Sequence, residues 1–269
     1  MKVKTHIAAT FAIVLFILSS CKKVYDYVEH HPTATSDACK ITQFTVSEDG
    51  LTVIFDVTYD KKGNMISVVA REGYRVYMNF DQYYRYDKHN QLTDQIIAYH
   101  GYSVPITWHS YQYAHNKIID SVYQNSGNLS DTKPPVNAPA SAKAYYNITT
   151  DNFGRIVSFT ASNNYSGSFQ YNDQENLIRT FPATYDDKIN PYRTNPVWQQ
   201  VFWDYSANNP ILHLAPPDYS LAKIVSYNSY GLPTKYVAYD GFRYNGGRFG
   251  FGFDTLEIKY DCDISKVGY

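Results

Sequence analysis

A seven-residue segment of the form Tyr-Asp-x-x-Gly-x-aliphatic recurs along this chain and constrains its fold more than any other feature. The clearest copy reads YDKKGNM, and an asparagine replaces the glycine in the second copy. The copies are Tyr59–Met65, Tyr86–Leu92, Thr150–Ile156, Tyr171–Leu177 and Tyr227–Pro233, and Tyr113–Ile118 is one residue shorter. Their spacing is irregular, so the pattern does not predict a solenoid with a fixed rung.

The residue types in this segment are those of a β-hairpin turn. The Asp or Asn after the tyrosine can accept hydrogen bonds from backbone N–H groups two residues further on. Gly or Asn at the fifth position suits a left-handed backbone, which closes a type I turn with a bulge. Each copy therefore predicts two antiparallel strands. Glu175 suits the left-handed position poorly, so we expect the fourth hairpin to be longer or bulged.

The residues between the turns show the two-residue periodicity of β-strands. Apolar side chains occupy every second position of residues 51–59, 74–80 and 256–260, and long helical periodicity is missing. Consecutive hairpins with short connections favour an antiparallel meander. We therefore expect an all-β fold, in which repeated β-hairpins curl into a barrel-like or half-barrel sheet.

Two segments interrupt the repeats. Residues 126–144 are small, polar and rich in proline, and are expected to form a flexible loop. Residues 181–219 hold six of the twelve prolines, and residues 197–203 within them predict a turn or two of helix. A structureless loop of this length is uncommon in a compact domain. We expect this insert to pack against the sheet or to cap an open end.

The N-terminus has the pattern of a bacterial lipoprotein signal. Two lysines precede an apolar run over residues 7–18, and the run leads into Leu18-Ser19-Ser20-Cys21, which resembles a lipobox. A membrane-spanning helix is the alternative, but the run is shorter than the roughly 20 residues needed to cross a bilayer. We therefore expect acyl chains on Cys21.

This signal divides the chain into three predicted regions: a cleaved signal peptide over 1–20, a lipidated N-terminus and linker over 21–38, and an all-β repeat domain over 39–269. Lys22 and Lys23 stand where an inner-membrane retention signal would have an Asp. We therefore predict a lipid anchor in the outer membrane. The sequence leaves open whether the domain faces the periplasm or the cell surface.

The charge of the mature chain argues against a nucleic-acid partner. Without residues 1–20 the chain has 22 Lys and Arg residues and 25 Asp and Glu residues, with no basic block. Nucleic-acid binding requires a clustered positive charge. The expected partners are the membrane, through the N-terminal lipid, and a glycan or an envelope protein.

Cys39 and Cys262 lie near the two ends of the mature domain. In an oxidising compartment, they predict a disulfide, and the alternative is two buried free thiols. The chain-entropy model assigns such a long loop a stabilisation of roughly 5 kcal/mol, which native strain lowers.

Aromatic side chains are the main candidates for ligand binding, because they can stack on sugar rings or anchor a protein partner. The densest clusters are Trp198, Trp203 and Tyr205 in one segment and Trp108 with Tyr102 and Tyr111 in another. The alternative is that these rings fill the interior of a tyrosine-rich sheet.

The chain has none of the easily recognised hydrolase signatures, such as Gly-x-Ser-x-Gly or His-Glu-x-x-His. Acidic residues are plentiful, but most serve turns, and nothing selects a catalytic pair. His100, His109 and His115 match no common zinc spacing. We therefore predict no catalytic residue, no metal site and no cofactor.

Several features together resemble the Bacteroidota lipoproteins that have YD (RHS-like) repeats and a porin-like β fold. These features are the repeated hairpins, the lipobox at Cys21, the early Cys39, and Asn209-Pro210 followed by the segment from Tyr227 to Thr234. The resemblance implies many antiparallel strands in a curled sheet. It carries over no catalytic residue.

We therefore expect a non-enzymatic lipoprotein of the cell envelope that binds or scaffolds a glycan, a peptide or an envelope protein. The alternative is a polysaccharide hydrolase with an unrecognised carboxylate pair in the 181–219 insert or at the barrel mouth. A structural spacer without a small ligand is a third possibility.

Overall fold

The computed structural model describes residues 38–71, 80–99, 105–124, 128–130, 133–136, 144–178, 183–212, 223–238, 251 and 253–263. The predicted signal peptide, the lipidation site Cys21 and Tyr102 lie outside these residues, as does most of the predicted loop over 126–144.

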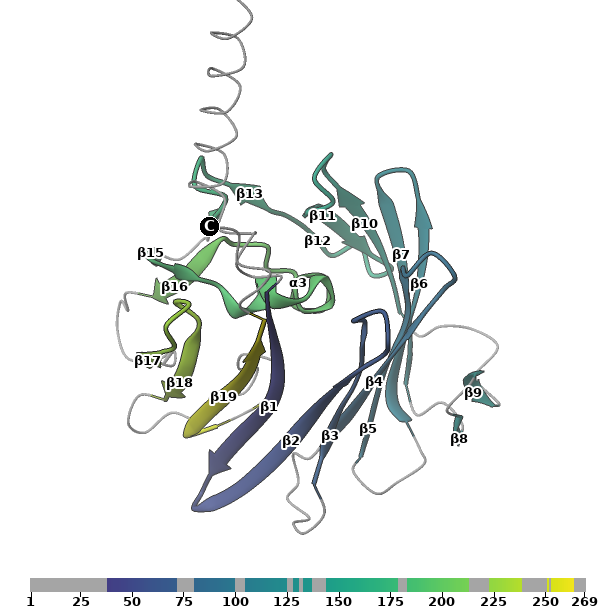
Figure 1. Cartoon of the computed structure of the whole chain (residues 1–269). Coiled ribbons are helices and arrows are strands. Elements are labelled where there is room, and N and C mark those ends of the chain that lie inside the picture. The colour runs from purple at the N-terminus through teal and green to yellow at the C-terminus, as the bar shows by residue number, and fades with distance from the viewer. Residues whose placement is uncertain are drawn as a thin grey trace, which may run out of the picture.

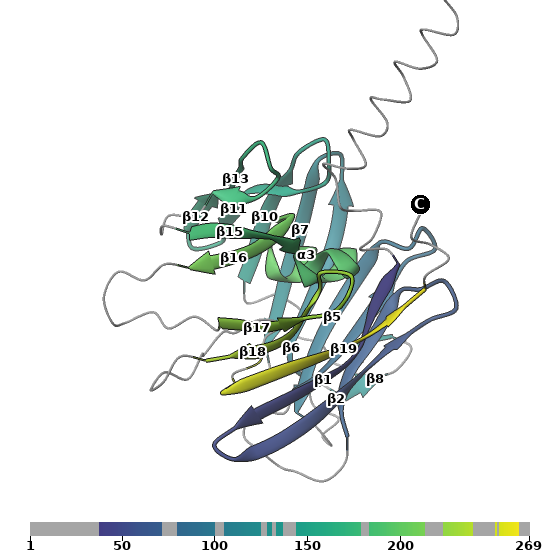
Figure 2. The same ribbon diagram turned by 60° about the vertical axis from the view of Figure 1, so that its left-hand side comes forward.

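The described chain is built around a 13-stranded antiparallel sheet that curls around a short helix (Figures 1 and 2), which confirms the predicted half-barrel. In chain order its strands are β1 (Cys39–Glu48), β2 (Leu51–Tyr59), β3 (Met65–Ala70), β4 (Phe80–Tyr86), β5 (Leu92–Tyr99), β6 (Pro105–Ala114), β7 (Lys117–Gln124), β10 (Ala144–Thr150), β11 (Ile156–Ala161), β12 (Ser166–Ser168), β17 (Lys223–Tyr227), β18 (Pro233–Val237) and β19 (Thr255–Cys262). The spatial order is β12-β11-β10-β7-β6-β5-β4-β3-β2-β1-β19-β18-β17, so the sheet stays open between β12 and β17.

The remaining elements are short. Three two-stranded sheets are formed by β8 (Asn128–Ser130) with β9 (Lys133–Val136), β13 (Gln170–Tyr171) with β14 (Leu177–Ile178), and β15 (Ala183–Ile189) with β16 (Asn208–Leu212). A 3-10 turn, η1 (Pro191–Thr194), and the helix α3 (Pro196–Phe202) lie between β15 and β16.

The repeated hairpin turns share one hydrogen-bond pattern. In the first, Asp60 Oδ1 accepts the backbone N–H of Lys62 at 2.8 Å and that of Asn64 at 2.9 Å. The residue in the left-handed position, Gly63, donates its N–H to the backbone carbonyl of Asp60. Asp87, Asp151, Asn172 and Asn228 accept the corresponding pairs of N–H groups in the other turns. These contacts confirm the predicted turn chemistry.

The prediction of a longer or bulged fourth hairpin is wrong, because its turn has the same length and the same hydrogen bonds as the first turn. Glu175 adopts φ +60° and donates its N–H to the carbonyl of Asn172, as the glycine does in the first turn. Its carboxylate accepts hydrogen bonds from the Arg193 guanidinium at 3.2 and 3.3 Å. This interaction offsets part of the cost of a left-handed backbone at a residue with a side chain.

The tyrosines of the repeats join one hairpin to the next. Tyr86 donates its hydroxyl to the backbone carbonyl of Met65, the last residue of the preceding segment, at 2.6 Å. Tyr113 does the same to Leu92 at 2.7 Å. Tyr171 donates to Ile156, Tyr185 to Leu177 and Tyr260 to Pro233 in the same way. Each bond therefore satisfies a strand carbonyl while the ring fills the interior of the curled sheet.

The described part of the 181–219 insert, residues 183–212, packs its helix into the concave face of the sheet, as the sequence predicts. The Asn195 side chain caps α3 by accepting the backbone N–H of Val197, and Pro196 takes the first helical position. Trp198 is fully buried in the main core cluster and meets Phe44 edge-on, with ring centroids 5.9 Å apart. The helix thus supplies the apolar surface that the inner face of the sheet requires.

A disulfide joins Cys39 to Cys262, as predicted, and excludes the alternative of two free thiols. The two residues lie directly opposite each other in the register of β1 and β19. The bond therefore links the first and last strands of the described sheet, which are neighbours in space.

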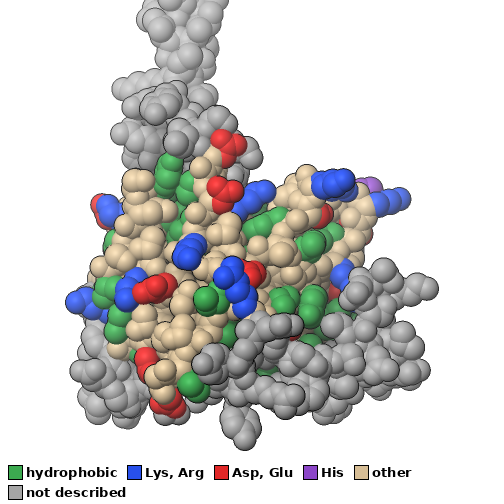
Figure 3. Space-filling model, turned by 60° about the horizontal axis from the view of Figure 1, so that its bottom comes forward, with side chains coloured by type: hydrophobic (Ala, Val, Ile, Leu, Met, Phe, Trp, Pro, Cys, Tyr) green, Lys and Arg blue, Asp and Glu red, His purple; other side chains and the backbone are tan. Residues whose placement is uncertain are grey.

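The surface carries mixed charge. On the face shown in Figure 3, Lys and Arg side chains are interspersed with Asp and Glu side chains over the described residues. Of the helices in the described part of the chain, none has the length and apolar character needed to cross a bilayer.

Removal of one tyrosine hydroxyl should weaken the sheet measurably. We predict that Tyr86→Phe lowers the free energy of unfolding by about 1–2 kcal/mol, because the Met65 carbonyl loses its donor inside the fold. Urea denaturation followed by circular dichroism checks this. The control is Tyr145→Phe, which alters an exposed ring and should change the stability by less than about 0.5 kcal/mol. Equal effects of the two variants would contradict the prediction.

The buried tyrosines also predict a loss of stability in alkali. Burial raises the pKa of Tyr113 to about 12, and burial likewise raises the pKa of Tyr59 and Tyr86. Unfolded tyrosines ionise near pH 10, roughly two units earlier than Tyr113 in the fold. Above pH 10 the unfolded state binds fewer protons, so stability falls as the pH rises, and below pH 10 these groups contribute no pH dependence. Urea midpoints between pH 8 and 11 measure this slope, and Tyr113→Phe should make it shallower.

Candidate functional site

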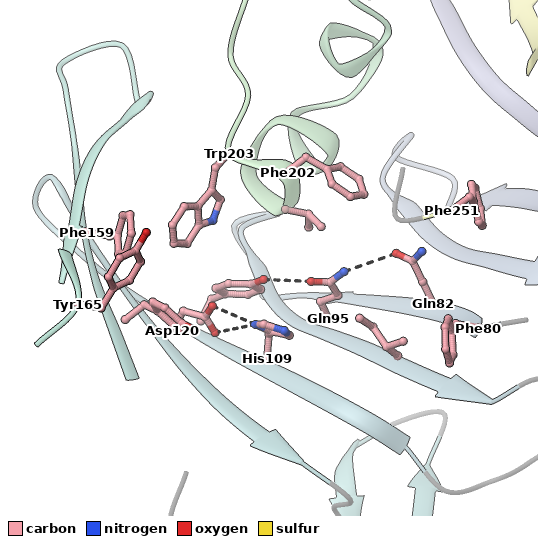
Figure 4. A pocket seen from close by; sticks show the side chains of 14 residues that line it. Phe80, Gln82, Gln95, His109, Asp120, Phe159, Tyr165, Phe202, Trp203 and Phe251 are labelled. Atoms are coloured by element: carbon pink, nitrogen blue, oxygen red, sulfur yellow. Dashed lines mark hydrogen bonds and ion pairs between the residues drawn. The ribbon is translucent and has the colours of Figure 1, made fainter. Parts of the chain in front are cut away.

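The inner face of the sheet and the end of α3 enclose a cavity with a volume of about 500 Å³, called here the concave cavity (Figure 4). Strands β4 to β7, β10 and β11 supply one side, and α3 and the residue after it supply the other. Among the described residues, the lining consists of four polar side chains (Gln82, Gln95, His109 and Asp120), two aliphatic ones (Ile97 and Val201) and eight aromatic ones (Phe80, Tyr111, Tyr146, Phe159, Tyr165, Phe202, Trp203 and Phe251).

The four polar side chains lie on the neighbouring strands β4, β5, β6 and β7 and are called here the polar floor. Gln95 lies directly opposite His109 in the sheet register, and Asp120 lies directly opposite Tyr111. Side chains alternate between the two faces of a strand. His109 and Tyr111 therefore share the inner face of β6.

His109 and Asp120 form a largely buried hydrogen-bonded pair. His109 Nδ1 lies 3.0 Å from Oδ2 and 3.1 Å from Oδ1 of Asp120. The side chains are 23% and 4% exposed, so solvent screens their interaction only weakly. A buried carboxylate needs such a partner. The pairing fixes the orientation of the imidazole ring and leaves Nε2 on the edge that faces away from Asp120.

The two glutamines belong to a second hydrogen-bond chain. Gln82 Oε1 accepts the hydroxyl of Tyr84 at 2.6 Å and the amide of Gln95 at 3.5 Å. Gln95 Oε1 accepts the hydroxyl of Tyr111 at 3.3 Å. Burial raises the pKa of Tyr84 and of Tyr111 well above the usual value, which keeps both phenols protonated as donors. These hydrogen bonds therefore fix the orientation of both glutamine amides, with each Oε1 bonded to the protein.

Four rings form a wall at one end of the cavity, called here the aromatic wall: Tyr146, Phe159, Tyr165 and Trp203. Trp203 is half-buried, with its ring centroid 4.8 Å from Phe159 and 5.9 Å from Tyr146. It ends α3 in a left-handed conformation with φ +51°. Large rings in this conformation are uncommon and cost backbone strain.

The cavity combines aromatic faces with planar polar groups, and it contains one carboxylate, that of Asp120, among its described residues. Hydrolysis of glycosides by an acid pair requires two. In the described part of the chain, no group of three or more His, Cys, Asp or Glu side chains could hold a metal ion. Of the two other histidines near His109 in the sequence, His115 lies in the turn between β6 and β7, and His100 lies outside the described residues.

The structure separates the aromatic residues that the sequence grouped together. Trp203 lines the concave cavity. Trp198, also a predicted ligand-binding residue, is fully buried in the core, which fits the alternative that these rings fill the interior of the sheet. Tyr205 is half-buried, packs against the core and is not part of the lining. Trp108 points to the opposite face of the sheet, where its Nε1 donates to Asp94 at 2.8 Å.

Sequence reasoning missed the polar floor. Gln82, Gln95 and Asp120 occupy inward positions of strands whose other inward residues are apolar or aromatic. A polar residue at a core-facing position of an alternating strand is the signal that could have identified them. His109 was considered only as a metal ligand.

No protein-family model matches the chain, and no curated protein matches it. Among solved structures, a porin-like protein from Bacteroides uniformis ATCC 8492 is similar to this chain, with a TM-score of 0.34 and 10% sequence identity. The match covers 84% of this chain and 97% of that chain. A similarity this distant assigns the chain to no family, and the membership in the YD-repeat lipoproteins stays a prediction.

The two tryptophans of the insert should differ in their effect on stability. We predict that Trp198→Ala lowers the free energy of unfolding by about 3–5 kcal/mol, because it leaves a cavity in the core. Trp203→Ala should cost only about 1–2 kcal/mol, because it removes ring contacts from a half-buried position. Chemical denaturation measures both values. A larger loss for Trp203→Ala would place that residue in the core instead.

Proposed function

We propose that this chain is a lipid-anchored protein of the bacterial cell envelope that binds a glycan in the concave cavity without cleaving it. The observation that carries this proposal is the polar floor of Gln82, Gln95, His109 and Asp120 beside the aromatic wall. A binding cavity of several hundred Å³ with aromatic faces and a few fixed polar groups is typical of small-molecule sites.

A glycan fits this combination better than an apolar ligand does. The C–H faces of a sugar ring pack on aromatic rings, here those of Trp203 and Phe159. Its hydroxyls need hydrogen-bond partners when they leave water. The glutamine amides and His109 can supply these partners, whereas a lipid would leave them unsatisfied.

The proposal favours binding over hydrolysis because of the state of Asp120. This carboxylate already accepts from His109 Nδ1, and no second acid joins it among the described lining residues. The glycosidase mechanism needs a proton donor and a second carboxylate some 5–10 Å apart.

The envelope location rests on the sequence and on one structural feature. The lipobox at Cys21 predicts the lipid anchor, and Lys22 and Lys23 favour the outer membrane. The Cys39–Cys262 disulfide suits an oxidising compartment outside the cytoplasm.

The test is a titration of the mature lipidated protein, in a detergent without a sugar headgroup, with a panel of neutral and acidic oligosaccharides. Tryptophan fluorescence and the release of reducing ends are followed together. We predict a saturable shift without new reducing ends, and about tenfold weaker binding for Trp203→Ala, which loses the stacking face.

The matched control is Phe153→Ala, which removes a ring that is 79% exposed on a hairpin turn and should leave the affinity unchanged. New reducing ends would replace the binding proposal with the hydrolase alternative. No shift with any oligosaccharide would refute glycan binding.

A further inference from the structure

The hydrogen bond between His109 and Asp120 in the polar floor sets the hydrogen-bonding character of His109. An ionised carboxylate only accepts hydrogen bonds, so Nδ1 of His109 carries the proton that Asp120 receives at 3.0 and 3.1 Å. In a neutral imidazole ring the other nitrogen then has a lone pair and accepts. No described residue donates a hydrogen bond to Nε2, which leaves this acceptor for a ligand.

The glutamines have the complementary character. The carbonyl oxygens of Gln82 and Gln95 accept hydrogen bonds from Tyr84 and Tyr111, and Gln82 also accepts from Gln95. An amide oxygen has two lone pairs, so both are used at Gln82, while one remains at Gln95 beside the amide N–H donors. The polar floor therefore offers donors together with acceptors, and a ligand hydroxyl, which both donates and accepts, satisfies both kinds.

The charge of the cavity also favours an uncharged ligand. Asp120 contributes a negative charge, and neither Lys nor Arg is found among the described lining residues. A ligand carboxylate would lose its hydration without gaining a cationic partner, and it would meet a like charge. A carboxylate also cannot donate to His109 Nε2.

From these observations, and resting on the glycan-binding function proposed above, we propose that the cavity selects uncharged sugars over uronic acids. Asp120 is the positioning residue for this selection: it holds His109 in the tautomer that accepts a hydrogen bond from a sugar hydroxyl.

The experiment compares matched pairs of oligosaccharides that differ only at C6. The mature lipidated protein is titrated at pH 8, above the usual range of histidine titration, with cellotriose against its C6-oxidised counterpart and with β-1,4-mannotriose against the β-1,4-mannuronate trimer. We expect each neutral trimer that binds to do so at least tenfold more tightly than its uronate counterpart.

Asp120→Asn tests the mechanism of the selection. The variant removes the charge, and its amide can donate to Nδ1, which moves the ring proton to Nε2. We expect the preference for the neutral sugar to fall to threefold or less. Asp187→Asn is the control, because it makes the same change at a side chain that is 86% exposed, and it should keep the wild-type preference.

A second measurement does not depend on any Asp120 variant folding. The imidazole ¹H–¹⁵N correlation spectrum of the wild-type protein at pH 8, with the His109 signals assigned by their loss in His109→Gln, should show the Nδ1–H tautomer. An Nε2–H ring or an imidazolium would overturn the inference. Equal or tighter binding of uronates would also overturn it while leaving glycan binding intact, whereas no binding of any trimer would remove both proposals.

Discussion

One side-chain oxygen at each turn determines how this sheet is built. In the first hairpin it is Asp60 Oδ1, which accepts two backbone N–H groups and so holds the left-handed residue that reverses the chain. Tyr86 and Tyr171, which precede two of these turns, donate their hydroxyls to the carbonyls of Met65 and Ile156 in the preceding hairpin. A local turn and a contact between hairpins are thus encoded by adjacent residues, which lets irregularly spaced copies assemble into one continuous meander.

The tyrosine rings fill only part of the interior of the curled sheet. A curled sheet of this width has an inner face that its own rings do not cover, and α3 of the insert packs there around Trp198. The seven-residue helix packs its Trp198 against Phe44 of β1 and Tyr84 of β4. The space that remains beside it, lined by β4 to β7, β10 and β11, is the concave cavity.

The parts that the sequence predicts are those encoded by local chemistry. The turns and the strands depend on residues a few positions apart, and the disulfide follows from two cysteines in a chain that is predicted to be secreted. Glu175 was misjudged because the compensating residue, Arg193, is distant in sequence. The polar floor was missed because it depends on the register of four strands. Trp198 and Trp203 were grouped because they are close in sequence, although five residues turn a helix by roughly 140° and place them on different sides.

Two features of the cavity cost folding free energy, and both concern residues that would meet a ligand. Trp203 has a left-handed backbone where it caps the C-terminal end of α3, and the other non-glycine residues with positive φ in the described chain, Asn90 and Glu175 among them, lie in hairpin turns. Asp120 keeps a charge in a largely dry interior, where a neutral side chain of similar size would be cheaper. Neither residue is required by the hairpin chemistry that forms the sheet. Both residues line the concave cavity, so both costs fall at the place that we propose as a binding site.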